Sequence, residues 1–251
     1  MKLALISPAS YLDKLPSTGY HMILAPQVVD EDYATFYASA KGYKILDNGA
    51  AEGRRVDNED LMSCASLLGV DEVVIPDCLG DAEETIFLAE GFEEWAAQAP
   101  GLSYMGVVQG ESLEEILECA QAFARMEYIS VLGLPRHLCS IDKSIRLDFC
   151  EQLPDEGLGA RFSSIHCLGS SSWIREVVCL SEINNVRGLD TALPVVMGLR
   201  KIDLVFERHY WHQPHPTQFF KREISEEQEV YIARNIETYR KWIEVSPTSP
   251  V

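Results

Sequence analysis

The sequence predicts a single (β/α)8 barrel, the TIM-barrel fold, whose outer layer is completed by a C-terminal helix. Eight short β-branched or aliphatic runs alternate with longer segments of helical spacing, and the length of 251 residues matches the ~250 residues of one such barrel. The main competitor is an open, doubly wound sheet, which carries a glycine-rich phosphate loop after its first strand. Here Ser7, Pro8 and Ala9 stand in that place, so the barrel is favoured.

Eight strands are expected, each bounded by turn residues. They are Leu3–Ile6, Met22–Leu24, Lys44–Leu46, Val73–Ile75, Met105–Val108, Ile129–Leu132, Ser164–Cys167 and Val186–Leu189. Between them, Asp81 with Glu84 and Ser112 with Glu115 have the spacing of a helix N-cap and a carboxylate that reaches back. A last amphipathic helix is expected from Ser225 to about Glu244.

The composition agrees with one domain over residues 1–245 and a flexible tail over 246–251, because no Pro- or Gly-rich linker divides the chain. No run approaches the ~20 apolar residues of a membrane span, and the apolar start is too short for a signal peptide. We therefore expect a cytoplasmic protein with no membrane partner. Seven cysteines, an odd number without any CxxC pair, fit neither a disulfide framework nor a thiolate zinc cluster.

The net charge of −18 limits how the chain can meet nucleic acid. Non-specific adhesion to phosphate backbones depends on Lys and Arg side chains that displace counterions. A strongly acidic chain is unsuited to it, so any nucleic-acid site must be local.

The C-terminal ends of the expected strands carry most of the unusual polar residues, and in such barrels these ends converge on the active site. They bear Asp47 and Asn48 on the third strand, Asp77 on the fourth, Gln109 on the fifth, Gly133 and Leu134 on the sixth, and Asp190 on the eighth. A single Asp after a strand is more often a helix cap or turn former than a catalyst. Three carboxylates at one rim change that balance, because they repel each other unless they meet a ligand or perform acid/base work.

Four of these strand ends form short motifs in a fixed order. They are Leu46-Asp47-Asn48-Gly49, Gly106-Val107-Val108-Gln109-Gly110, Gly133-Leu134 and Asp190-Thr191-Ala192-Leu193-Pro194. In that order they resemble the Asp-Ser-Gly-Gly, Gly-Ile-Val-Gln-Gly, Gly-Gly-Leu-Ala and Asp-Cys-Val-Leu-Pro segments of the tRNA-guanine transglycosylase superfamily, which includes phage and bacterial DNA-modifying relatives. No motif is specific alone, but their order and their places on strands argue against coincidence.

The resemblance implies a base exchange that needs no cofactor. Asp190 would attack the sugar C1′ and expel guanine, leaving a glycosyl ester that an incoming 7-deazaguanine opens. Asp47 would move protons on and off the two bases. The outcome would be retention of configuration, as in retaining glycosidases.

The same resemblance implies how the base is held. Asp77 would accept the N1–H and the exocyclic amine of a guanine-like base, and Gln109 and the Gly133 backbone N–H would donate to its O6. Asn48 and Leu134 are expected beside the base, with Asn48 in a position where the family has a serine.

Two departures from the family refine the expected substrate. The tRNA-modifying members hold a structural zinc with three cysteines and a histidine beyond the catalytic aspartate, but this chain has no cysteine after Cys179. We therefore expect no zinc-binding subdomain, and DNA is preferred over tRNA. The bacterial family also places a Glu where this chain has Leu138, so an aminomethyl group would lose its partner and the nitrile-bearing base preQ0 is preferred.

A flipped or single-stranded nucleotide needs a local grip. The candidate contacts are Arg200, Lys201, Arg208, Lys221 and Arg222, with Arg136 as a further candidate. Aromatic residues interleaved with these cations could stack bases, although a packed loop and helix would explain the same segment. The spacing of His209, His212 and His215 would suit a metal, but an aromatic-packed loop is the commoner outcome, and no metal is predicted.

Two alternatives remain open. The chain could be a compact tRNA-guanine transglycosylase, or a non-catalytic subunit that binds a base or nucleic acid within a heteromer. The joint presence of Asp47, Asp77 and Asp190 argues against the second, because a binding subunit needs no nucleophile. The acidity of the chain is compatible with a helper protein that opens the duplex.

Overall fold

The computed structural model describes residues 1–162, 164–170, 173–205 and 216–244. Eight parallel strands form one sheet in the order β1-β8-β7-β6-β5-β4-β3-β2. Their bounds are β1 Lys2–Leu5, β2 Tyr20–Leu24, β3 Tyr43–Asp47, β4 Glu72–Val74, β5 Ser103–Val107, β6 Ile129–Pro135, β7 Ile165–Leu168 and β8 Val186–Thr191. All eight strands expected from the sequence are confirmed.

The sheet curls into a nearly closed barrel. β1 pairs with β8, with Ala4 opposite Asp190, and β2 pairs with β3, with Leu24 opposite Asp47. β1 and β2 lie side by side, although no ladder of hydrogen bonds joins these two strands in the described chain. The (β/α)8 barrel expected from the alternating runs is therefore the fold.

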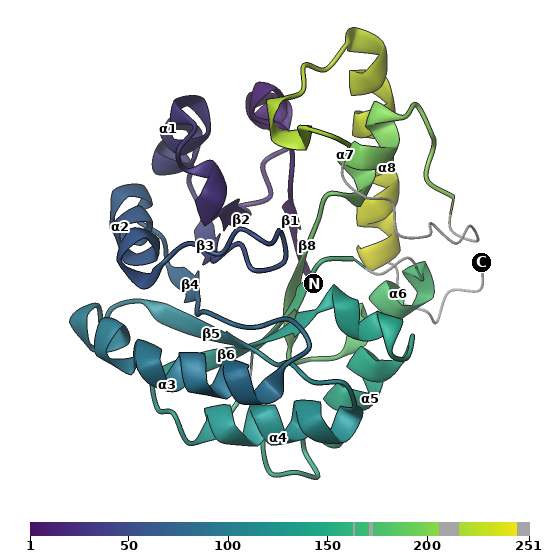
Figure 1. Ribbon diagram of the computed structural model, residues 1–251. Helices are drawn as coiled ribbons and strands as arrows, with labels where there is room; N and C mark the ends of the chain where they lie inside the picture. The colour runs from purple at the N-terminus through teal and green to yellow at the C-terminus, as the bar shows by residue number, and fades with distance from the viewer. Residues whose placement is uncertain (163, 171–172, 206–215, 245–251) are drawn as a thin grey trace.

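Helices surround the strands on the outside (Figure 1). They are α1 Glu31–Ser39, α2 Asn58–Leu68, α3 Ala82–Gln98, α4 Leu113–Ala124, α5 Ile145–Gln152, α6 Ile174–Glu182, α7 Leu193–Leu199 and α8 Glu226–Glu244. Short 3-10 turns lie at η1 Ala9–Lys14, η2 Ala25–Gln27, η3 Arg136–Ser140 and η4 Phe219–Lys221. Because helices cover the outer face of the sheet and side chains fill its interior, the strands are largely apolar on both faces.

The predicted helix starts are confirmed at two N-caps. The Asp81 side chain accepts the backbone N–H of Glu84, and the Ser112 hydroxyl accepts that of Glu115. The Glu115 carboxylate reaches back to the N–H of Glu111, one residue before the cap. The backbone N–H groups of Glu111 and Glu115, at the start of α4, therefore both have side-chain acceptors.

The C-terminal helix α8 packs lengthwise on α7, and the two lie next to each other in Figure 1. Gly198 permits this contact, because a side chain there would overlap Ile232 of α8. Asn235 of α8 is buried, and its Oδ1 accepts the Leu204 backbone N–H at 2.8 Å. The final helix is thus an integral part of the barrel's outer layer. Residues 246–251, the predicted tail, lie outside the described residues.

An ion pair lies at the N-terminal end of the barrel. Arg187 of β8 pairs with Glu72 of β4, whose Oε2 also accepts the Tyr43 hydroxyl at 2.7 Å. This end is committed to stability, which leaves the opposite rim available for chemistry. Every helix within the described ranges is too short or too polar to cross a bilayer.

Two glycine substitutions test the packing of the barrel with opposite expected signs. A Cβ at Gly106 of β5 would lie 2.7 Å from Cδ2 of Phe123 on α4. We expect Gly106→Ala to lower the free energy of unfolding by about 1–3 kcal/mol, because the helix must move outward. Urea unfolding measures the change.

Gly91→Ala is the matched control. Gly91 lies within α3 and is exposed, and nothing stands within 4 Å of its added Cβ. Alanine is the better helix former, so the free energy of unfolding should rise by about 0.5–1 kcal/mol. If Gly106→Ala left the free energy of unfolding unchanged, α4 would not be packed on β5 as described.

Candidate active site

The structure places the three predicted aspartates at one rim. Asp47 ends β3, Asp77 follows β4, and Asp190 lies near the end of β8. The negative charges of Asp77 and Asp190 are close enough to Asp47 to help raise its pKa. The strand ends therefore converge as expected, and the site can be built up from three groups of contacts around these carboxylates.

The first group holds Asp77 between two amides. Asn48 Nδ2 donates to Asp77 Oδ1 at 2.8 Å, and Gln109 Nε2 donates to Asp77 Oδ2 at 2.6 Å. Asn48 Nδ2 also donates to the Ile75 carbonyl, and the Gln109 carbonyl oxygen accepts the Gly80 N–H. Burial raises the pKa of Asp77, while the two amide donors oppose that change. The carboxylate is thus fixed in orientation, with acceptor capacity left on each oxygen.

The second group joins Asp47 to a residue that sequence reasoning missed. Asp47 Oδ1 accepts the Gly49 N–H at 2.7 Å. Burial and the nearby charge of Glu52 raise the pKa of Asp47 well above its ordinary value. Glu52 lies in the turn after β3, and burial followed by the charges of Asp190 and Asp77 raises its pKa as well. A glutamate in an irregular turn has no spacing that would have marked it in the sequence.

The third group fixes one oxygen of Asp190. His166 Nε2 lies 3.2 Å from Asp190 Oδ1, and the Gly169 backbone N–H donates to the same oxygen at 3.0 Å. No described residue donates to Oδ2. His166 was not predicted from the sequence, although it is the one imidazole in β7, Ile165–Leu168, whose other residues are Ile, Cys and Leu. A polar residue inside an apolar strand is the signal that could have found it.

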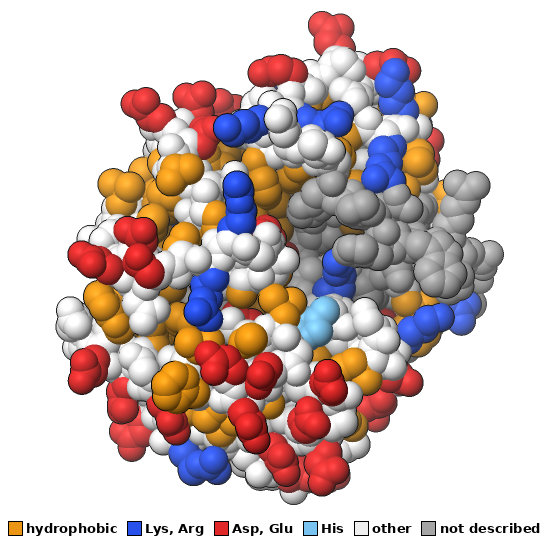
Figure 2. Space-filling model, in the orientation of Figure 1, with side chains coloured by type: hydrophobic (Ala, Val, Ile, Leu, Met, Phe, Trp, Pro, Cys, Tyr) orange, Lys and Arg blue, Asp and Glu red, His pale blue; other side chains and the backbone are white. Residues whose placement is uncertain are grey.

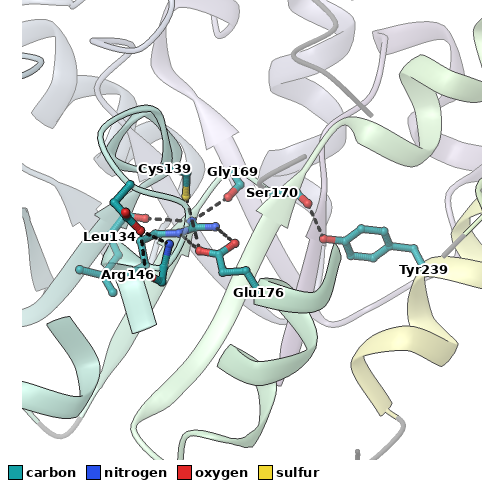
Figure 3. A network of polar contacts seen from close by, with 9 residues as sticks. Leu134, Cys139, Arg146, Gly169, Ser170, Glu176 and Tyr239 are labelled. Carbon is teal, nitrogen blue, oxygen red and sulfur yellow. Dashed lines mark hydrogen bonds and ion pairs between the residues drawn. The ribbon is translucent and has the colours of Figure 1, made fainter. Parts of the chain in front are cut away.

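A buried ion pair supports the loop that carries Gly169 (Figure 3). Arg146 of α5 binds Glu176 of α6 through two hydrogen bonds, Nε to Oε1 at 2.6 Å and Nη2 to Oε2 at 2.8 Å. Arg146 Nη1 also donates to the carbonyls of Leu134 and Gly169, at 3.3 and 3.0 Å. One guanidinium therefore ties the end of β6 to the loop after β7 and holds the carbonyl of Gly169, the residue whose N–H reaches Asp190.

Tyr239 of α8 reaches the same loop. Its hydroxyl donates to Ser170 Oγ at 2.8 Å, beside Gly169 (Figure 3). The C-terminal helix thereby contacts the loop beneath the site as well as the barrel wall.

Two predicted base-binding residues lie deeper in the barrel than the sequence suggested. The Leu134 side chain is in the hydrophobic core, so its carbonyl, already bonded to Arg146, is its polar contribution. Gly133 lies inside β6, where a Cβ would be 2.9 Å from Leu168 Cδ1 and 3.0 Å from Met105 Sδ. Lack of a side chain at Gly133 is required by packing, and the donation of its N–H to a base stays a prediction.

Three buried polar atoms on the loops at this rim have no hydrogen-bond partner in the described chain. They are Ser7 Oγ after β1, Glu52 Oε2 after β3 and His137 Nε2 after β6. Buried polar groups are nearly always paired in folded proteins. Unsatisfied atoms on three loops of one rim are what a site awaiting a polar ligand would contain.

The predicted nucleic-acid contacts have mixed positions. Arg200, Lys201, Lys221 and Arg222 are exposed, and Arg208 lies outside the described residues, as do His209, His212 and His215. Lys201 already pairs with Glu227, and Arg222 donates to the Thr217 carbonyl at 3.4 Å. In Figure 2, acidic side chains crowd the lower part of the face, over α3 and α4, and others lie along the upper edge. Most of the Lys and Arg side chains in this view lie over the centre, the upper part and the right side.

Arg136 differs from the other cations because it belongs to the mouth. It is half-buried in η3, and its side chain lies against Gly169. Burial and the nearby Arg146 lower the pKa of Arg136, while the charge of Asp190 opposes that change. No salt bridge to Arg136 occurs within the described residues, so its charge is available to an anion.

Neither a known protein-family model nor a curated protein matches this chain. Among the described residues, no three His, Cys, Asp or Glu side chains are arranged to hold a metal ion. The interpretation of the rim therefore depends on its own geometry and on the four short motifs.

Breaking the buried ion pair should be costly. We expect Glu176→Ala to lower the free energy of unfolding by about 3–5 kcal/mol, because it leaves the fully buried Arg146 guanidinium without its counter-charge. The double variant Arg146→Met/Glu176→Leu should recover part of that loss, since it removes both charges. Chemical unfolding of the three proteins measures the difference, and a double variant less stable than the single one would contradict it.

Asp47→Asn should stabilise the protein above the ordinary pKa of aspartate. The native state holds the Asp47 proton more tightly than the unfolded state, because burial and Glu52 raise its pKa. Its contribution to stability is therefore present in acid and lost as the pH rises through the raised pKa. At about pH 8 the variant should melt higher, by roughly 2–4 °C for each kcal/mol relieved, and the two curves should converge near pH 3, below the ordinary Asp pKa of ~3.9.

The matched control is Asp155→Asn, which removes the same charge from an exposed loop before β7. It should leave the melting temperature nearly unchanged over the same pH range. Equal gains from both variants would mean that overall acidity, and not the environment of Asp47, sets the effect.

Proposed function

We propose that the protein replaces guanine in DNA with a 7-deazaguanine through a covalent Asp190–glycosyl intermediate. One observation carries the proposal: Asp190 stands at the barrel mouth with Oδ1 held by His166 and Gly169 while Oδ2 has no donor in the described chain. A carboxylate fixed on one side and free on the other is suited to nucleophilic attack.

The proposed reaction has two displacements. Asp190 Oδ2 bonds to the sugar C1′ while the C1′–N9 bond breaks. The electron pair of the broken bond leaves with the guanine, which takes up a proton on N9. The incoming 7-deazaguanine then loses the proton on its ring nitrogen, bonds to C1′ and returns the carboxylate. Each base bond formed matches one broken, so no external energy source is required.

Asp47 suits the proton transfers. Its pKa, raised by burial and by the charge of Glu52, lets the carboxyl group keep a proton at a higher pH than an exposed aspartate does, and a general acid needs that proton in the first step. The same group, once ionised, can accept the proton of the incoming base. Glu52, whose pKa is also raised, is the neighbour that keeps the pair from ionising together.

Asp77 supports recognition of a guanine-type base. Its two oxygens lie side by side between Asn48 and Gln109, and such a carboxylate can accept an N1–H and an exocyclic amine together. The second N–H of the Gln109 amide remains to donate to O6. Leu138 is fully buried in the core and offers nothing to an aminomethyl group, which favours preQ0.

A nucleic-acid substrate would have to approach an acidic molecule. Arg136 at the mouth and the exposed Lys221 are local positive charges that could meet phosphates, and Arg200 and Arg222 are further exposed cations of the same region. The target nucleotide must leave the stack, because a duplex hides both C1′ and the base edge. A helper protein that opens the duplex fits this requirement.

The test is an exchange assay with guanine-labelled DNA, single-stranded and duplex, and with preQ0 or its aminomethyl analogue preQ1. Label should leave single-stranded DNA in the presence of preQ0. Asp47→Asn should slow release by roughly 10²–10⁴-fold, Asp190→Asn should abolish it, and Asp155→Asn should have no effect. Exchange with preQ1 at the faster rate would show that another carboxylate, such as Glu52, replaces the family's Glu.

The alternatives give different results in the same assay. Release from tRNA but not from DNA would establish a compact tRNA-directed enzyme. A non-catalytic subunit would be favoured by two results together. The protein would bind either nucleic acid without releasing the labelled guanine, and Asp190→Asn would leave the activity of the assembled complex unchanged. A covalent adduct mapped to a residue other than Asp190 would overturn the mechanism.

A further inference from the structure

A buried row of three polar side chains crosses the barrel beneath the mouth. The Tyr20 hydroxyl of β2 lies 2.8 Å from His166 Nδ1 of β7, and His166 Nε2 lies 3.2 Å from Asp190 Oδ1 of β8. The exposed fractions of these residues are 1%, 0% and 5%. Three polar groups placed together inside an apolar barrel are costly unless each satisfies the next.

The barrel is shaped to hold Tyr20 in this row. A Cβ at Gly188, two residues before Asp190, would lie 2.7 Å from the Tyr20 ring and 2.8 Å from its hydroxyl oxygen. The Tyr20 ring also stacks on Tyr43, with centroids 5.9 Å apart. The Lys2 ammonium lies 5.6 Å from the Tyr20 ring centroid. These neighbours therefore hold the Tyr20 side chain in the position in which its hydroxyl lies next to His166.

The direction of the two hydrogen bonds follows from the groups at the ends of the row, the Tyr20 hydroxyl and the Asp190 carboxylate. Burial raises the pKa of the Tyr20 hydroxyl further above its ordinary value, so Tyr20 keeps its proton and can donate it to Nδ1. An imidazole that accepts at Nδ1 carries its own proton on Nε2. That proton points to Asp190 Oδ1, the oxygen that the Gly169 N–H also contacts.

We propose that His166 is a positioning residue that Tyr20 locks in one tautomer, so that His166 and Gly169 together hold Asp190 Oδ1 and turn Oδ2 toward the substrate. The consequence for the reaction rests on the proposed function, in which Asp190 is the nucleophile. In the second step the same two donors stabilise the carboxylate that leaves C1′, so the row acts on both displacements.

The orientation itself can be tested without any activity. Long-range ¹H–¹⁵N spectra of histidine-labelled protein distinguish the two neutral tautomers and the imidazolium. We expect His166 to carry its proton on Nε2, Tyr20→Phe to change the Nδ1 signal, and Asp190→Asn to change the Nε2–H signal. A proton on Nδ1, or signals that respond to neither substitution, would overturn the proposal.

Kinetics separate positioning from simple folding. In His166→Gln, the amide nitrogen takes the position of His166 Nε2 and keeps a donor for Asp190. In His166→Asn, the shorter side chain places its amide nitrogen near the position of Nδ1, beside Tyr20, and leaves Asp190 without this donor. Loss of a hydrogen bond to a charged group is expected to slow adduct formation by about 10- to 100-fold in His166→Asn. His166→Gln should restore most of the rate, and KM for the free base should stay unchanged in both, because neither contacts the base.

Two further variants protect this test. His21→Asn makes the same substitution in β2, where His21 Nε2 contacts the Lys41 carbonyl, and it should not change the rate. Tyr20→Phe removes one hydroxyl with little change in volume, so it serves if the His166 variants do not fold, and it should also slow adduct formation. Wild-type rates in both Tyr20→Phe and His166→Asn would overturn the proposal.

The outcomes also separate this proposal from the proposed function. If the spectra are as expected but wild-type protein exchanges no base on DNA or tRNA, the proposed function fails and the locked orientation of Asp190 stands. If exchange occurs and depends on Asp190 but not on His166 or Tyr20, the function stands and the positioning role is wrong.

Discussion

The convergence of buried carboxylates at one rim is the constraint on which the rest of this structure depends. Parallel strands that close into a barrel carry their C-terminal ends to the same side, so Asp47, Asp77 and Asp190 meet although they are far apart in the chain. The turn after β3 adds Glu52 to them. Burial raises the pKa of Asp47, Glu52 and Asp77, which is the physical sign that their ionised forms are under strain.

The molecule balances that strain in a different way at each carboxylate. Amide donors from Asn48 and Gln109 hold Asp77, and one backbone N–H holds Asp47. Asp190 receives an imidazole and a peptide N–H. Because each environment differs, the three acids can take different chemical roles, as pairs of carboxylates do in glycosidic chemistry. Folded proteins retain such costly arrangements mainly where function requires them.

Support for the rim comes from outside it. The Arg146–Glu176 pair ties the end of β6 to the loop after β7, and α8 reaches the same loop through Tyr239. The opposite end of the barrel has its own pair, Arg187 with Glu72. Charge is thus paired where the fold needs stability. At the mouth, Arg136 has no salt bridge and Ser7 Oγ and Glu52 Oε2 have no hydrogen-bond partner among the residues that the structure describes.

The sequence by itself determined the barrel and the rim. Strand number, helix starts and the places of Asp47, Asp77, Gln109 and Asp190 follow from short-range patterns, because hydrophobic period and capping are local properties of a chain. The tertiary structure alone decided the rest: Glu52 enters through an irregular turn, and His166 acquires its partners from β2 and β8. No local pattern encodes such contacts, since they exist only once strands distant in sequence pack around one interior.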